Sequence, residues 1–227
     1  WLAHPDPSLT DADVAQLRPM RLGHYFEHLW HLWLRDHPRY QVVLANEAWR
    51  ANGITLGETD LLIYDRESKQ TEHWELAVKF YLGFGDLSSR GHWHGPQFRD
   101  RLDRKFEHLR LSQTRLTRTD VVQQQLAQRG IIISAVRCVV KGRLFLPWQS
   151  FHQHLTIEFA AADALRGFWL TQSQWRLLAA DFPFCRRLSR EQFLAPLTAQ
   201  QINDTFIAIP DSDLDRPIAL AICNADG

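Results

Sequence analysis

The sequence has few cysteines and no excess of charge of either sign. Its three cysteines, Cys138, Cys185 and Cys223, are far apart and odd in number, so they show neither metal-ligand spacing nor a disulfide framework. This usage favours a reducing compartment. Lysine and arginine total 26, and so do aspartate and glutamate, which excludes a strong overall field towards nucleic acid or a membrane. Any binding of nucleic acid must therefore rest on local charge.

Long apolar runs and low-complexity tracts are also missing from the 227 residues. No run approaches the roughly 20 apolar residues that a transmembrane helix needs, and no signal-peptide pattern is visible. The hydrophobic fraction of 45% is that of a globular protein, and the length suits one large domain. We therefore expect a soluble cytoplasmic protein with no membrane partner.

Hydrophobic periodicity predicts a mixed α/β core followed by an extension. In chain order, the predicted core elements are a helix over 21–36, strands over 40–45, 55–65 and 70–82, helices over 97–116 and 119–129, and a strand over 131–140. The last strand is rich in β-branched residues, which indicates burial on both faces. Residues 155–180 look mainly helical, and roughly the last 45 residues suggest short strands. The whole predicts one domain: an N-terminal helical segment (1–20), a core (21–145) and a C-terminal α+β extension packed on it (146–227).

Two neighbouring predicted strands carry the sharpest functional signal. Glu58 and Asp60 share one face of the first strand, and Glu75 and Lys79 share one face of the second. A tight hairpin brings these faces together, and crowded carboxylates repel unless a hard divalent cation neutralises them. A lysine beside such a cation can orient the attacking water or stabilise charge on a phosphate. The pattern indicates a site for Mg²⁺ or Mn²⁺.

At these residues the sequence resembles the PD-(D/E)XK, or restriction-endonuclease-like, superfamily. The core of that superfamily runs helix, three strands, helix, strand, which is the predicted order. Its motif has an aspartate on the second strand, an acid and a lysine on the third, and often a glutamate on the first helix. The matching positions in this sequence are Asp60, Glu75, Lys79 and Glu27, with Glu58 as a supporting acid in the stretch Gly57-Glu58-Thr59-Asp60.

Most of the chain also resembles an uncharacterised bacterial family, domain of unknown function 1853. The stretches that carry this second resemblance are Tyr25-Phe26-Glu27, Glu75-Leu-Ala-Val-Lys79-Phe-Tyr81 and Asp100-Arg-Leu-Asp-Arg-Lys105. That family brings no activity with it, so the functional expectation comes from the superfamily alone.

The superfamily resemblance implies hydrolysis of phosphodiester bonds in DNA with Mg²⁺. Asp60 and Glu75 would bind the metal, Glu27 would assist, and Lys79 would position the water. One departure matters, because the superfamily places its lysine two residues after the acid, where Ala77 stands. Lys79 lies four residues after Glu75, roughly 13 Å along a strand. A catalytically inactive member that binds nucleic acid is therefore the first alternative.

The first predicted helix supports a second alternative, a zinc metallopeptidase. Residues three and four apart are neighbours on a helix, so His24, Glu27, His28 and His31 lie on adjoining turns. His24-x-x-Glu27-His28 fits the inverted zinc-peptidase pattern, with two histidines on Zn²⁺ and the glutamate as general base. That chemistry needs a third ligand, such as Glu107. The apolar face of this helix equally fits core packing with the histidines at its margins.

Local positive charge gathers after the third predicted strand. Seven basic residues lie between Arg99 and Arg118, against three acids. Such a concentration suits phosphate contacts. The superfamily resemblance places this helix beside the active cleft, which makes four residues candidates for contact with the nucleic-acid backbone or a ligand carboxylate: Arg101, Arg104, Lys105 and Gln113. A solvated helix face with pairs such as Asp100–Arg104 is the alternative.

The loop before this helix contains His92-Trp93-His94. These side chains are candidates for contact with substrate. The alternative, which we favour, is a loop anchored by a buried tryptophan.

Overall fold

The computed structural model describes residues 10, 12–13, 20–153, 155–182, 184–188, 191–194, 218 and 220–223. They belong to two compact units, one from Trp1–Val78 and Arg104–Lys141 and the other from Lys79–Asp103 and Gly142–Gly227. Most of the predicted N-terminal helical segment, 1–20, lies outside the described residues, as do most of the residues after 194. The packing of the 146–227 extension on the core stays a prediction.

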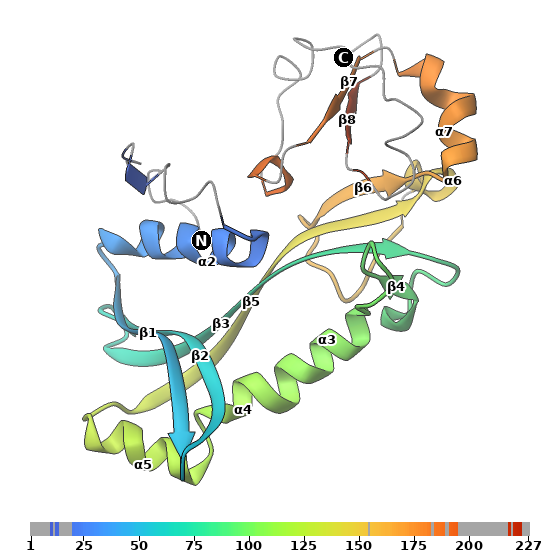
Figure 1. Cartoon of the computed structure of the whole chain (residues 1–227). Helices are drawn as coiled ribbons and strands as arrows, with labels where there is room; N and C mark the ends of the chain where they lie inside the picture. The colour runs from blue at the N-terminus through green and yellow to red at the C-terminus, as the bar shows by residue number, and fades with distance from the viewer. Residues whose placement is uncertain are drawn as a thin grey trace. The chain divides into compact units, whose positions relative to one another are not determined.

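The chain has a mixed α/β fold around a six-stranded sheet. In the first unit lie α2 (Leu22–Arg35), β1 (Tyr40–Ala51), β2 (Ile54–Asp65), the first part of β3 (Gln70–Gly83), most of α3 (Leu102–His108), η2 (Leu109–Gln113), α4 (Thr114–Leu116), α5 (Asp120–Gln128) and the first part of β5 (Ile133–Pro147). This order of helix, three strands, helices and strand is the one that the periodicity predicts, and Figure 1 shows it.

The helix α2 forms because apolar residues recur at helical spacing and Pro38 lies just beyond its end. Phe26, Trp30 and Leu34 are buried at intervals of four residues. The Trp30 ring meets Trp74 of β3 edge to face, with 5.9 Å between ring centroids. These contacts hold α2 against one face of the β2–β3 hairpin.

The sheet has the order β1-β2-β3-β5-β6, with β4 pairing β3 off this path. Strands β1 and β2 are antiparallel and joined at Asn52-Gly53, whose φ angles are both positive (50° and 79°), as a two-residue hairpin turn requires. Strands β2 and β3 are also antiparallel, joined by the predicted turn over 66–69. The arrows of β3 and β5 point the same way in Figure 1, as strands joined by a helical crossover can.

The helix predicted over 97–116 begins five residues late and contains an irregular turn. Its first residues form a loop instead, because Phe98 has a left-handed φ of 58°, which ends any α-helix at that point. The Phe98 N–H donates to the Gly95 carbonyl at 2.8 Å, which closes a turn over Pro96. After α3, the segment η2 is a π-helix.

The second unit contains the rest of β3 and β5 and further short elements: η1 (Arg90–His92), β4 (Trp93–His94), α6 (Trp148–Phe151), β6 (Leu165–Trp169), α7 (Gln172–Leu178), η3 (Ala179–Asp181), β7 (Phe184–Arg187), η4 (Glu191–Phe193) and β8 (Leu220–Cys223). Strands β7 and β8 pair antiparallel, as the short-strand prediction for this region expects. None of the helices in the described residues is long and apolar enough to cross a membrane.

Two expectations about the later part of the chain are wrong. Residues 155–180 are not mainly helical, because β6 pairs parallel with β5 from Arg143↔Leu165 to Pro147↔Trp169. The Phe145 ring lies over Gly167, 2.8 Å from the position that a Cβ on this glycine would occupy. Tertiary packing therefore overrides helix propensity there. The β-branched strand is not buried on both faces either, since only Val139 and Leu146 of β5 are buried.

Candidate acidic site

Asp60 and Glu75 lie where β2 and β3 part. The last recorded pair of this ladder is Leu61↔Trp74, and one step further the two strands carry Asp60 and Glu75. From here β2 continues beside β1, where Glu58 is opposite Ala48. Oδ2 of Asp60 accepts a hydrogen bond from the Leu76 N–H at 2.6 Å, in place of a backbone partner. The Asp60 carboxylate therefore fills the fork between the strands.

Negative charge dominates the surroundings of Asp60. Burial raises the pKa of its carboxyl to about 7, and Glu75 is the next largest cause, while the bond from Leu76 opposes both. Glu27 of α2 and Glu58 of β2 raise the pKa further. The other three acids that the sequence singled out, Glu27, Glu58 and Glu75, thus all act on the carboxyl of Asp60.

Glu75 is fully buried and held by a hydrogen-bond network. Its Oε1 is 2.6 Å from Nε2 of His73, and its Oε2 accepts from Nε2 of Gln113 at 2.8 Å. Nζ of Lys105 donates to Oε1 of the same glutamine at 3.0 Å. Nδ1 of His73 lies 3.0 Å from Oγ1 of Thr117. The glutamine therefore links the lysine of α3 to the buried carboxylate.

The π-helical turn explains how Lys105 and Gln113 reach the same point. In an ideal α-helix, residues eight apart are offset by about 80° around the axis. A π turn holds more residues per turn and removes most of this offset. The π turn η2 (Leu109–Gln113) follows Lys105 and ends at Gln113, so the two side chains come to one face. Such π turns are frequent at functional sites.

Cys138 of β5 belongs to the same surroundings. The residue is exposed, and partial desolvation is the largest cause that raises the pKa of its thiol; Glu75 adds to this, Lys105 opposes it, and Asp60 adds again. The Lys105 amine and both acids are thus within electrostatic range of one thiol. The sequence reasoning missed Cys138, His73 and Thr117. Only His73 had a usable signal in the sequence, because it lies two residues before Glu75 and therefore shares its face of the strand.

Lys79, the predicted catalytic lysine, is part of the second unit. Its Nζ donates to Oδ2 of Asp100 at 2.7 Å, and the Tyr81 hydroxyl donates to the same oxygen at 3.3 Å. The amine of Lys79 therefore already has a carboxylate partner. Ala77, at the position where the superfamily has its lysine, is buried.

The predicted nucleic-acid contacts divide between loop and helix. Arg101 precedes α3, and its guanidinium donates twice to Asp103, at 2.7 and 2.8 Å. Arg104 and Lys105 lie on α3, and Gln113 ends η2. Of the four, Lys105 and Gln113 are connected to Glu75 by hydrogen bonds.

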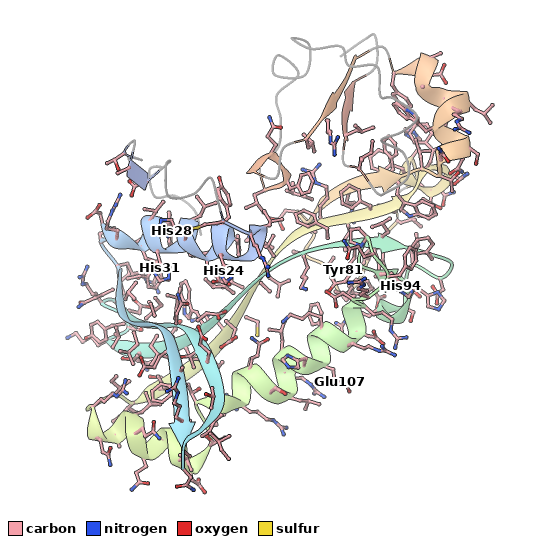
Figure 2. All side chains as sticks on the ribbon, viewed as in Figure 1. His24, His28, His31, Tyr81, His94 and Glu107 are labelled. Atoms are coloured by element: carbon pink, nitrogen blue, oxygen red, sulfur yellow. The ribbon has the colours of Figure 1, made fainter. Side chains whose placement is uncertain are left out.

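The histidines of α2 line a depression of about 510 Å³, whose wall consists of Met20, Arg21, His24, Glu27, His28, His31 and Asn46. Nδ1 of His24 is 3.4 Å from Oε2 of Glu27. Glu107, its suggested third ligand, is on α3 and does not line this depression (Figure 2). In the part of the chain that the structure describes, no group of three or more His, Cys, Asp or Glu side chains is arranged to hold a metal ion.

A magnesium ion fits the donor chemistry of the Asp60–Glu75 pair. Mg²⁺ is commonly held by one or two carboxylates, with waters and substrate phosphate completing six oxygen ligands. Among the described residues, the recorded hydrogen bond to Asp60 involves Oδ2 alone, and the partner of Glu75 Oε2 is the neutral amide of Gln113. In the described part of the chain, Oδ1 of Asp60 thus has no hydrogen bond, and both oxygens of Glu75 are engaged with His73 and Gln113, neither of them a lysine or arginine.

The fold and these residues define a mixed α/β protein with a buried acidic pair on its central sheet. The family described as Domain of unknown function (DUF1853) matches residues 1–211, so the chain belongs to that family, as its sequence predicted. No curated protein and no solved structure has a significant match to the chain.

Proposed function

We propose that this protein is a Mg²⁺-dependent nuclease of the restriction-endonuclease-like type, acting on DNA. The observation that carries the proposal is the pair Asp60 and Glu75, side by side at the fork of β2 and β3 with the charge of neither balanced by an arginine or lysine among the described residues. The preference for DNA rests on the superfamily resemblance.

The order of elements supports the proposed core. Helix α2 precedes three consecutive antiparallel strands, and α3 to α5 then lead to β5, which neighbours β3. The acids lie on the elements that the resemblance requires: Glu27 on the first helix, Asp60 on the second strand and Glu75 on the third.

In this proposal Asp60 and Glu75 bind the metal, and Glu27 assists. A bound Mg²⁺ would polarise the phosphate and lower the pKa of an attacking water. Hydrolysis joins the water oxygen to phosphorus and breaks one P–O ester bond, whose oxygen leaves with a proton. Gln113 orients Glu75, and Lys105, freed from Gln113, donates to a phosphate oxygen.

The proposal gives Lys105 the role that the sequence analysis expected of Lys79. Two observations favour Lys105: its bond to Gln113, and its effect on the pKa of Cys138 together with Glu75 and Asp60. Lys79 is engaged with Asp100. Arg104 of α3 remains a candidate for phosphate contact.

The test is cleavage of labelled single-stranded, duplex and branched DNA with 5 mM Mg²⁺ and, separately, with EDTA. Wild type should cleave at least one substrate only with the metal. Asp60→Asn and Glu75→Gln should each lower the rate at least about a hundredfold. Glu67→Gln, which changes an exposed acid in the turn between the same strands, is the matched control and should cleave like wild type.

Comparing the two lysines tests the division of roles. Lys105→Ala should lower the rate by about a hundredfold, and Lys79→Ala by less than about threefold. The reverse result would return the role to Lys79. If wild type cleaves no substrate but binds DNA, the protein is the inactive member of the first alternative. Stoichiometric zinc that is lost in His28→Ala would support the peptidase instead.

A further inference from the structure

The loop over 94–101 of the second unit holds an exposed aromatic ring. Phe98 has 62% of its surface exposed, at the tip of this loop. His94 and Arg101 form an isolated β-bridge at its base, and the Gly95 N–H donates to the Asp100 carbonyl at 2.8 Å. A third bond, from the Phe98 N–H to the Gly95 carbonyl, closes the tip. The backbone that carries Phe98 is therefore held by hydrogen bonds of the loop itself.

The backbone of Phe98 is in a conformation that bulky residues rarely adopt. Its φ of 58° lies in the left-handed region, which is unfavourable for a non-glycine residue. Burial offsets little of this cost, because the residue is 62% exposed. Strain of this kind is concentrated at sites that bind ligands.

The exposed ring is one end of an aromatic cluster. The centroid of Phe98 lies 5.2 Å from that of Phe84 and 5.5 Å from that of His94. Phe84 in turn lies 4.6 Å from Trp169 of β6. One side of the Phe98 ring is thus supported by other rings, and the remainder is available to a further flat ring.

The acids near this loop are paired, and one of its arginines is not paired among the described residues. Asp100 accepts from Lys79 and Tyr81, and Asp103 accepts twice from Arg101. Arg99, directly after Phe98, is exposed and has no ion pair among the described residues. The two local acids are therefore matched, and a cationic side chain remains beside the exposed ring.

We infer that this loop, with Phe98 and Arg99, binds single-stranded nucleic acid. An unpaired base stacks on the Phe98 ring, and Arg99 contacts the adjacent phosphate. Stacking on aromatic side chains beside basic residues is how proteins bind single strands without sequence preference. A duplex cannot use the ring, because its bases are already stacked. The inference rests on the proposed function only for the class of ligand, and it adds that the bound strand is unpaired at this point.

Binding is measured by fluorescence anisotropy in EDTA, so that no cleavage occurs. The probes are a 20-nucleotide oligo-dT and an abasic strand with the same backbone. Phe98→Ala should weaken oligo-dT binding about tenfold, the worth of one stacked base, and leave the abasic strand unchanged. Leu177→Ala removes another exposed apolar side chain of this unit, 82% exposed on α7, and should change neither.

Two further variants separate the ring from the loop. Phe98→Asn deletes the ring but keeps a residue that tolerates the left-handed conformation, so it should behave like Phe98→Ala. Phe98→Tyr keeps an aromatic face and should bind like wild type. Arg99→Ala should weaken both probes and reduce the salt slope of binding by about one.

The inference is overturned if Phe98→Asn binds oligo-dT like wild type, if it weakens both probes equally, or if wild type binds neither probe. A loop that instead recognises a protein would give the last of these results. The proposed nuclease is tested separately from the loop. Asp60→Asn should lose cleavage and retain binding of oligo-dT. Ring-dependent binding by a wild type that cleaves nothing would support the loop and overturn the nuclease.

Discussion

The two faces of the β2–β3 hairpin carry acids in opposite electrostatic states. Side chains alternate along the register, so Asp65 and Glu72 lie on one face and His73 and Glu75 on the other, with Asp60 at the fork. On the first face, Arg39 holds the pKa of Asp65 down to about 2 and Arg137 lowers the pKa of Glu72. At the fork, burial and neighbouring carboxylates raise the pKa of Asp60 to about 7.

This difference separates acids that are paired with an arginine from acids that are not. Each paired acid has an arginine that donates two hydrogen bonds to it. Among the described residues, no arginine or lysine donates to Asp60 or Glu75, although these two acids lie on the same strands, β2 and β3, as Asp65 and Glu72. Burying carboxylates without a cation lowers stability, so the pair at the fork is costly unless a ligand supplies the charge.

The largest expected effect on stability is at the arginine-paired face. Glu72→Gln should lower the free energy of unfolding by about 2 kcal/mol at pH 7, because it removes a charge-assisted pair to Arg137 from a buried side chain. Since the pKa of Glu72 is lowered in the folded state, its contribution is present above the unfolded pKa and is lost as pH falls through the folded pKa. Urea unfolding at pH 7 and pH 3 measures both.

The control for this variant is Asp36→Asn, which changes an acid whose side chain is 89% exposed. It should unfold like wild type at both pH values. Equal stability of Glu72→Gln and wild type at pH 7 would show that the arginine pair contributes nothing, and the two faces would then not differ as described.

Asp60→Asn should change the free energy of unfolding in the opposite direction to Glu72→Gln, and by less. The folded pKa of Asp60, about 7, exceeds its ordinary value of about 4. The folded state therefore binds a proton more tightly, and ionised Asp60 lowers stability progressively as pH rises from about 4 to 7. The variant, which can still accept from the Leu76 N–H, should gain about 1 kcal/mol at pH 8, because solvent screens the charge of a partly exposed side chain.

The pH dependence of this gain distinguishes charge from packing. At pH 4 wild-type Asp60 is protonated, so the difference between variant and wild type should vanish in urea unfolding without divalent ions. A gain that persists at pH 4 would mean that packing explains it. A loss at pH 8 would contradict the cost assigned to the fork.

Alternation and hairpin geometry were enough to predict that Asp60 and Glu75 come together. They depend only on a period of two and a short turn, both visible in the sequence. The main order of elements was predictable for the same reason, since long periodic segments such as Leu22–Arg35 carry strong local signals.

The support of the site was not predictable, because it depends on contacts far apart in sequence. Gln113 reaches Glu75 only through the π turn of η2, which has no local signature in Leu-Arg-Leu-Ser-Gln. The late start of α3 follows from the left-handed conformation of Phe98. The sequence does not reveal it, because the helical pattern of apolar residues continues through the loop. Strand β6 (Leu165–Trp169) forms by pairing with β5, a partner about 20 residues earlier that its own five residues cannot specify.

The smallest expected effect is that of the cation itself. If Mg²⁺ binds the folded fork alone, half saturation stabilises the protein by about 0.4 kcal/mol, and the gain grows with concentration. Thermal unfolding of wild type at pH 8 should therefore shift upwards across a MgCl₂ series, measured against KCl of matched ionic strength. Glu67→Gln should shift equally, and Asp60→Asn should not shift. Since Asp60→Asn starts from higher stability, the two unfolding curves should converge as Mg²⁺ replaces the missing positive charge in wild type. Parallel curves would mean that the cation binds elsewhere, and the acids at the fork would then have no demonstrated counter-ion.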